Sequence, residues 1–237
     1  MFEYLEIPYK YYEFNPYQTP KPQELLEVSP KGLVPALKLN EYTPPRALNE
    51  STIIIDFLEE LARQNGKERS LLPPGSEPYA RALIRLQTDH ISRAIIPTFY
   101  RYLLSQDREK QAEYGRELYD AIEGMVELFE RAEKELGDDP KLKTYLGLWS
   151  GGELGLADVY VAPWIFRATN VLAHYRGFEL PKGDKFSSWV QRLFDHPAFK
   201  ATCCTDDLYI DSYERLAYNR PNTSQTANAI NSGRPLP

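Results

Sequence analysis

The chain is poor in cysteine and histidine. Its 237 residues include two cysteines, the adjacent Cys203 and Cys204, and three histidines that are scattered along the sequence. A disulfide framework or a thiolate-rich zinc site is therefore not expected, and the isolated histidines predict no metal site.

Long apolar runs and a secretory leader are also missing. The apolar stretches fall far short of the ~20 residues that a membrane helix needs. The first residues, MFEYLEIPYKYY, lack the positive and apolar regions of a signal peptide. Acidic residues outnumber basic ones 34 to 28, giving a net charge of −6, which disfavours binding to nucleic acid. We expect a cytoplasmic protein with neither a membrane span nor a nucleic-acid partner.

Residues 1–65 have the pattern of a small α/β domain. Alternating or tyrosine-rich segments indicate strands, and helical spacing of apolar residues follows Ser51, a suitable N-cap residue. The predicted order is strand, helix, strand, strand, helix, at Tyr9–Asn15, Pro22–Val28, Val34–Leu39, Arg46–Leu48 and from Ser51.

The remainder of the chain has a different pattern. Residues 66–78 contain Gly75 and three prolines, a linker composition, and residues 79–218 read as helix throughout. The final segment, 219–237, is polar and without periodicity, so we expect a flexible tail. The predicted helices span Tyr79–Leu104, Arg108–Leu136, a segment from Leu156, Phe186–Phe194 and Asp206–Tyr218.

Two motifs in the α/β domain bear on function. Gly32-Leu33-Val34-Pro35 places a proline at the start of a strand, where a cis bond would expose the backbone of Val34. Asn49-Glu50-Ser51 directly precedes a helix, whose N-terminus favours a carboxylate. By themselves, both motifs are also explained as structural features: an ordinary trans proline at a strand edge and a helix cap.

Together these motifs resemble the glutathione transferase superfamily, and its omega-like branch in particular. The segment Leu154–Asp158 is similar to the family's capping motif, with Gly155 in the place of Ser or Thr. The resemblance implies an incomplete thioredoxin-like domain followed by an all-helical bundle domain, and glutathione as cofactor. The implied glutathione contacts are the main chain of Val34 beside a cis Pro35, then Glu50 and Ser51 at the γ-glutamyl end, and Lys21 at the glycyl carboxylate.

The resemblance begins late in the family's first domain. Met1–Ile7 resembles the end of the first helix, so the first strand and the catalytic Cys, Ser or Tyr have no counterpart, and no catalytic residue is predicted. A truncated sequence, a replacement segment from the tail or a partner chain, and a smaller rearranged sheet all remain open. Without a cysteine at the site, thiol transfer is disfavoured.

A hydrophobic second substrate is expected between the two domains. The resemblance implies a pocket on the long helix and on the helix from Leu156, where Pro97 should kink the former. Its expected residues are Arg93, Pro97, Tyr100, Trp164 and Arg167. Core packing is the favoured explanation of Trp164 by itself, and a solvated face explains Arg93 and Arg167 as well as a pocket does.

These observations lead to one functional prediction and one alternative. The prediction is a glutathione transferase-type enzyme that adds the glutathione thiolate to a small hydrophobic electrophile. The addition ends in conjugation, or it is reversed to give cis–trans isomerisation in secondary metabolism. The alternative is a non-catalytic binding or regulatory scaffold. A homodimer is implied by the resemblance.

Overall fold

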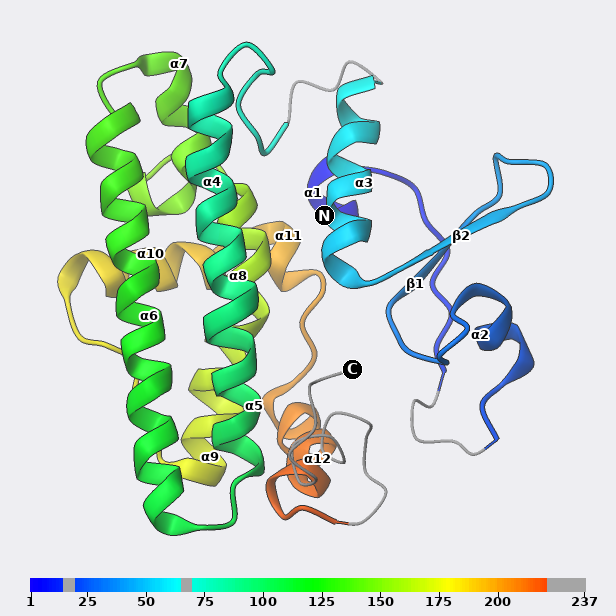
Figure 1. The fold of residues 1–237 in the computed structure, drawn as a ribbon, viewed down its shortest axis with the longest axis vertical. Helices are drawn as coiled ribbons and strands as arrows, with labels where there is room; N and C mark the ends of the chain where they lie inside the picture. The colour runs from blue at the N-terminus through cyan, green and yellow to red at the C-terminus, as the bar shows by residue number, and fades with distance from the viewer. Residues whose placement is uncertain (15–19, 65–69, 221–237) are drawn as a thin grey trace. The chain divides into compact units, whose positions relative to one another are not determined.

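The computed structural model describes residues 1–14, 20–64 and 70–220, and the account below is of these residues. The chain divides into two compact units, Met1–Ser70 and Leu71–Pro237 (Figure 1). Residues 66–69 of the expected linker and residues 221–237 of the expected tail lie outside the described residues.

The described part of the first unit holds a β-hairpin and three helices: α1 (Phe2–Leu5), α2 (Gln23–Val28), β1 (Ala36–Leu39), β2 (Arg46–Asn49) and α3 (Ser51–Gln64). The two strands are antiparallel, with Ala36 opposite Asn49 at one end and Leu39 opposite Arg46 at the other. The predicted helix at Pro22–Val28, the predicted hairpin and the predicted helix from Ser51 are confirmed.

Helix α3 forms because its apolar residues recur every four positions. Ile54, Leu58 and Ala62 lie on one face and are buried, as expected for an amphipathic helix on a small core. The helix begins at Ser51, and the carbonyl of Glu50 accepts the Ile54 N–H at 3.0 Å. Glu50, rather than the predicted Ser51, therefore occupies the cap position.

The first strand, predicted at Tyr9–Asn15, is wrong over residues 9–14. Residues 9–14 have no regular secondary structure, and Asn15 lies outside the described residues. Tyr9, Tyr11 and Tyr12 are exposed, and the Tyr9 hydroxyl donates to a Glu3 carboxylate oxygen at 2.7 Å. Tyrosine content favours a strand only where a neighbouring strand pairs with it. The described part of the sheet contains β1 and β2 alone.

The second unit is helical throughout its described part. Its elements are α4 (Pro78–His90), the π-helical turn η1 (Ile91–Ile95), α5 (Ile96–Leu104), α6 (Arg108–Leu136), α7 (Pro140–Lys143), the 3-10 segment η2 (Thr144–Ser150), α8 (Leu156–Arg167), the π-helical turn η3 (Ala168–Leu172), α9 (Ala173–Arg176), α10 (Asp184–Asp195), α11 (Pro197–Lys200) and α12 (Asp206–Ala217). The five predicted helices are confirmed. Among the described residues, no helix is both long and apolar enough to cross a bilayer.

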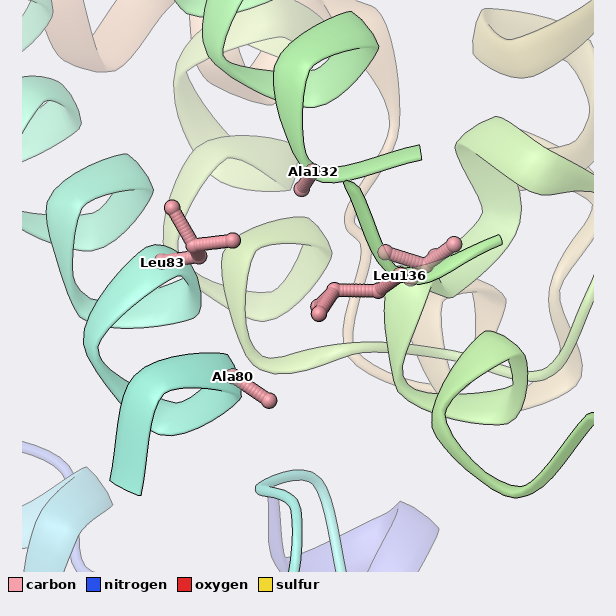
Figure 2. Packing of buried hydrophobic residues seen from close by; sticks show 5 residues of the cluster. Ala80, Leu83, Ala132 and Leu136 are labelled. Atoms are coloured by element: carbon pink, nitrogen blue, oxygen red, sulfur yellow. The ribbon is translucent and has the colours of Figure 1, made fainter. Parts of the chain in front are cut away.

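Helices α4 and α5 pack along the long helix α6, with α8 against α4 (Figure 1). Figure 2 shows Ala80 and Leu83 of α4 near Ala132 and Leu136 of α6, in a cluster completed by Leu146. The two alanines let the helix backbones approach closely, and the leucines fill the space that remains. Each buried leucine contributes about 1.5–3 kcal/mol.

Pro97 lies at the start of α5, directly after the π-helical turn η1. A proline has no N–H to donate to the carbonyl four residues earlier, here Arg93, and its ring crowds that turn. The wider π turn at Ile91–Ile95 accommodates this local change, and the chain continues as helix on both sides. The expected interruption at Pro97 thus takes the form of a π turn.

A buried carboxylate joins three segments of the second unit. Asp158 of α8 accepts the backbone N–H of Leu148 at 2.8 Å and of Gly155 at 2.9 Å on one oxygen, and Trp189 Nε1 donates to the other at 2.8 Å. Burial raises the pKa of Asp158, and the three hydrogen bonds oppose that rise. A Cβ at Gly155 would lie 2.9 Å from the Cα of Gly147, so close packing explains glycine at this cap.

Candidate functional site

The hairpin brings the two motifs of the first unit to the same end. Val34 and Pro35 precede β1, Glu50 and Ser51 follow β2, and Ala36 lies opposite Asn49. Fourteen residues lie between Pro35 and Glu50 in the sequence, but the pairing of the two strands brings the motifs to the same end of the hairpin. Val34 and Pro35 of the first motif and Glu50 and Ser51 of the second are exposed to solvent.

A tight turn presents Val34. Ser29 is buried, its carbonyl accepts the Gly32 N–H at 2.7 Å, and its hydroxyl accepts the Leu33 N–H at 3.1 Å. The Val34–Pro35 peptide bond is cis, as predicted. Val34 itself is 50% exposed, so the backbone beside it is accessible to a ligand.

Lys21 is held next to this turn by Gly32. Gly32 has a φ of 63°, in the left-handed region, and a Cβ built on it would lie 2.9 Å from Cγ of Lys21. The stem of Lys21 therefore packs directly on the glycine. This contact brings the predicted cation to the loop that carries Val34.

The first unit thus offers a cation, an open helix N-terminus, an acid and an exposed stretch of backbone. Lys21 and the start of α3 suit carboxylates, and Glu50 suits an ammonium group. A small peptide with both kinds of charge can be held at its ends by such a set. Its main chain can pair with the backbone at Val34.

In the second unit, three of the five predicted substrate residues lie together. The ring centroids of Tyr100 and Trp164 are 5.6 Å apart, and the Arg167 guanidinium lies 5.6 Å from the Trp164 ring. Arg167 also donates to the carbonyl of Pro163 at 2.9 Å. This arrangement fixes a cation above an aromatic surface.

Helix α12 supplies two residues that the sequence reasoning missed. The Arg167 guanidinium lies 5.4 Å from the ring of Tyr209 and 5.8 Å from that of Tyr213. Tyr209 and Tyr213 are four residues apart, which places both on one face of the helix. This spacing is the sequence signal that could have identified them. Burial raises the pKa of Tyr209, so its hydroxyl stays protonated at neutral pH.

The other two predicted residues are placed differently. Arg93 is exposed and its Nε donates to a carboxylate oxygen of Asp89 at 2.6 Å, a solvated helix pair. Pro97 lies one turn before Tyr100 on α5, which puts the two on the same helix face.

In the described part of the chain, no group of three or more His, Cys, Asp or Glu side chains is arranged to hold a metal ion. His90 Nε2 lies 2.7 Å from the carbonyl of Ala121, a structural contact. Cys203 and Cys204 are free and belong to the second unit, and burial raises the pKa of the Cys203 thiol. Neither cysteine belongs to the unit that carries the Val34 and Glu50 motifs.

Comparison with known proteins assigns this arrangement, a small hairpin unit followed by a helical unit, to one class of protein. The glutathione S-transferase N-terminal domain matches residues 1–66, and the C-terminal domain of the same family matches residues 82–192. The chain belongs to the glutathione S-transferase family, and glutathione is its cofactor.

Three relatives illustrate the match. Glutathione transferase Omega 3C from Trametes versicolor is 31% identical, with a TM-score of 0.68 over 91% of this chain and 82% of that one. Rice glutathione transferase GST1, solved in complex with glutathione, is 24% identical, with a TM-score of 0.67 over 91% and 88%. A maleylacetoacetate isomerase from Aspergillus fumigatus is 26% identical over 75% of this chain and 71% of its own.

Proposed function

We propose that this protein binds glutathione at the Val34–Pro35 and Glu50–Ser51 end of its hairpin. There the glutathione thiol acts as a nucleophile toward a small hydrophobic electrophile. The observation that carries the proposal is the pairing of Ala36 with Asn49, because it sets an exposed backbone segment beside an open helix N-terminus. Lys21, packed on Gly32, adds the cation that a second carboxylate needs.

Each part of glutathione has a matching group. The γ-glutamyl end carries an ammonium and a carboxylate, which suit Glu50 and the start of α3 with the Ser51 hydroxyl. The cysteinyl unit pairs with the main chain of Val34, and the glycyl carboxylate reaches Lys21. Glutathione is thereby held at both ends and the middle, which fixes the position of its sulfur.

The chemistry uses glutathione's own sulfur. At a thiol pKa of ~8.5, a few per cent is thiolate at neutral pH. Addition of that thiolate to an electron-poor alkene forms a C–S bond and shifts the π electrons onto the activating group. Protonation of the adduct gives a conjugate. Rotation about the former double bond, followed by loss of the thiolate, gives the isomerised alkene and returns glutathione.

The hydrophobic substrate is proposed to bind the aromatic group of the second unit. Tyr100 and Trp164 offer apolar ring surface, and Arg167 offers a positive charge for the activating oxygen of an enone or acid. The isomerase relative supports isomerisation as one outcome, because isomerisation is the reaction for which that protein is named.

The glutathione site is tested with the double variant Glu50→Ala, Ser51→Ala. Loss of charge-assisted hydrogen bonds of about 1.5–3 kcal/mol predicts affinity for glutathione about tenfold or more weaker by titration calorimetry. Glu41→Ala is the matched control, because Glu41 is an exposed acid of the hairpin turn, at the end opposite Glu50. Equal affinity in wild type and double variant contradicts the site.

The reaction is tested by incubating the protein with glutathione and cis enones or dienoic acids. Product analysis separates the two outcomes, because conjugation consumes glutathione and isomerisation leaves its amount unchanged. Tight binding of glutathione without either product supports the scaffold alternative and contradicts the proposed enzyme. The homodimer that the resemblance implies is measured on the same sample by light scattering.

A further inference from the structure

Both cysteines of the chain line one open cavity in the second unit. Cys203 and Cys204 lie in the connector between α11 and α12, where Cys203 is partly buried and Cys204 is exposed. The cavity has a volume of about 500 Å³, which lies in the range of ligand pockets. Two thiols on consecutive residues therefore open into the same space.

The wall of this cavity is aromatic. Phe166 of α8, Phe194 of α10 and Phe199 of α11 line it together with the thiols. Their ring centroids are 5.2 Å (Phe166 to Phe194), 5.4 Å (Phe166 to Phe199) and 5.7 Å (Phe194 to Phe199) apart, and the last pair is stacked. Mutual packing of the rings forms the apolar wall before any ligand arrives.

Backbone hydrogen bonds hold the connector that carries the cysteines close to the end of α11. The Thr202 N–H donates to the carbonyl of Phe199 at 3.0 Å, and the Cys203 N–H donates to that of Lys200 at 3.2 Å. The connector continues the turn of α11 up to Cys203. The pair is thus held next to Phe199 and is not carried on a long loose loop.

Adjacent thiols beside an apolar wall select a particular ligand chemistry. Thiol sulfur is soft and favours soft, polarisable centres, and two thiols on one backbone bind such a centre as a chelate with a high effective concentration for the second bond. The aromatic wall favours a ligand with an aryl group. We propose that the cavity formed by Cys203, Cys204 and the three phenylalanines captures aryl compounds of trivalent arsenic.

The replacement of As–O bonds by As–S bonds needs no oxidant. An aryl arsenous acid, ArAs(OH)₂, reacts with the two thiols to form two As–S bonds while two As–O bonds break. Each thiol proton leaves with a hydroxyl group as water, and arsenic stays trivalent. Both reactants are neutral, so a raised thiol pKa at Cys203 is compatible with the exchange, whereas disulfide exchange needs a thiolate.

The cavity adjoins the proposed substrate residues of the second unit. Burial raises the pKa of the Cys203 thiol, and the nearby charge of Arg167 opposes that rise; the ring of Phe166 lies 5.5 Å from that of Tyr209. Tyr100, Trp164 and Arg167 are not among the described residues that line the cavity. Arsenic binding to the two thiols is measured without glutathione, so its failure is distinguishable from a failure of the proposed function.

Phenylarsine oxide added to the full-length protein tests the dithiol site. Intact-mass spectrometry under native conditions and a thiol count with a chromogenic disulfide give a direct reading, because the chain has two cysteines. We expect one phenylarsenic group per chain and the loss of both thiols. Cys203→Ser and Cys204→Ser should each weaken binding about 100-fold, because the chelate is lost. An adduct that leaves one thiol titratable, or single variants that bind as tightly as wild type, overturns the proposal.

The aromatic wall is tested by comparing phenylarsine oxide with inorganic arsenite. Phe199→Leu should weaken binding of the aryl compound about tenfold and leave arsenite unchanged, since both thiols remain. Phe194→Leu repeats the test at a second ring if the first variant unfolds at a lower temperature. Phe178→Leu, a buried ring outside the cavity lining, is the matched control. An equal effect of Phe199→Leu on both arsenicals overturns the role of the wall.

Discussion

Replacing Asp158 by asparagine tests the packing of the helical unit most directly. One carboxylate oxygen accepts the N–H groups of Leu148 and Gly155, and the other accepts Nε1 of Trp189. An amide has a single acceptor oxygen and places an NH₂ group at the other position. The best orientation keeps the two backbone bonds and turns the NH₂ group toward the Trp189 donor.

The expected loss in the free energy of unfolding follows from the number of donors that lose their acceptor. Asp158 is 2% exposed, so water does not replace the lost partner, and an unsatisfied buried donor costs about 1–3 kcal/mol. Asp158→Asn should therefore lower the free energy of unfolding by about 1–3 kcal/mol. Asp158→Ala, which leaves three donors without a partner, should cost more. The exposed Asp138→Asn changes the net charge equally and should cost less than about 0.5 kcal/mol.

Urea unfolding monitored by tryptophan fluorescence measures these differences. A double-mutant cycle with Trp189→Phe isolates the contact, because the phenylalanine variant removes the donor that faces the amide. In the Trp189→Phe background, Asp158→Asn should lower the free energy of unfolding by about 1 kcal/mol less than it does in the wild-type protein. A cost below about 0.5 kcal/mol for Asp158→Asn, or no coupling to Trp189, would refute the reasoning.

Three further predictions concern the glutathione loop and a histidine cap. Lys21→Met keeps the stem over Gly32 but removes the charge, so glutathione should bind about fivefold to tenfold more weakly by calorimetry, whereas the exposed Lys31→Met should bind normally. An equal loss in both variants speaks against the assigned role. Gly32→Ala should destabilise the chain by about 1–2 kcal/mol in urea unfolding, because φ is 63° there, and Gly75→Ala, with open space around its Cβ, is the control. His196 accepts the Ala198 N–H through Nδ1 at 3.2 Å, and burial lowers its pKa from 6.5. The stability it contributes is present above pH 6.5 and is lost as the pH falls through the lower folded pKa. His196→Asn keeps a capping oxygen and should remove this part of the dependence of the free energy of unfolding on pH. An unchanged dependence on pH contradicts the role assigned to His196.

Sequence patterns correctly predicted the elements whose contacts join residues close along the chain. The long helix α6 occupies the predicted range, Arg108–Leu136, because its apolar residues repeat at helical spacing and Asp107 caps its first turn. The hairpin was also predicted correctly, since its two strands are neighbours in sequence. The strand predicted at Tyr9–Asn15 failed because strand formation depends on a partner that composition does not reveal.

The sequence by itself determined the helical second unit, the hairpin of the first and the motif set that resembles the family, because these depend on contacts between residues close along the chain. Only the tertiary structure decided that Ala36 lies opposite Asn49, that Tyr209 and Tyr213 meet Arg167, and that Cys203 and Cys204 face three phenylalanines. The physical reason is the range of the interactions. Hydrogen bonds within a helix join residues four apart, whereas these contacts depend on how whole elements pack.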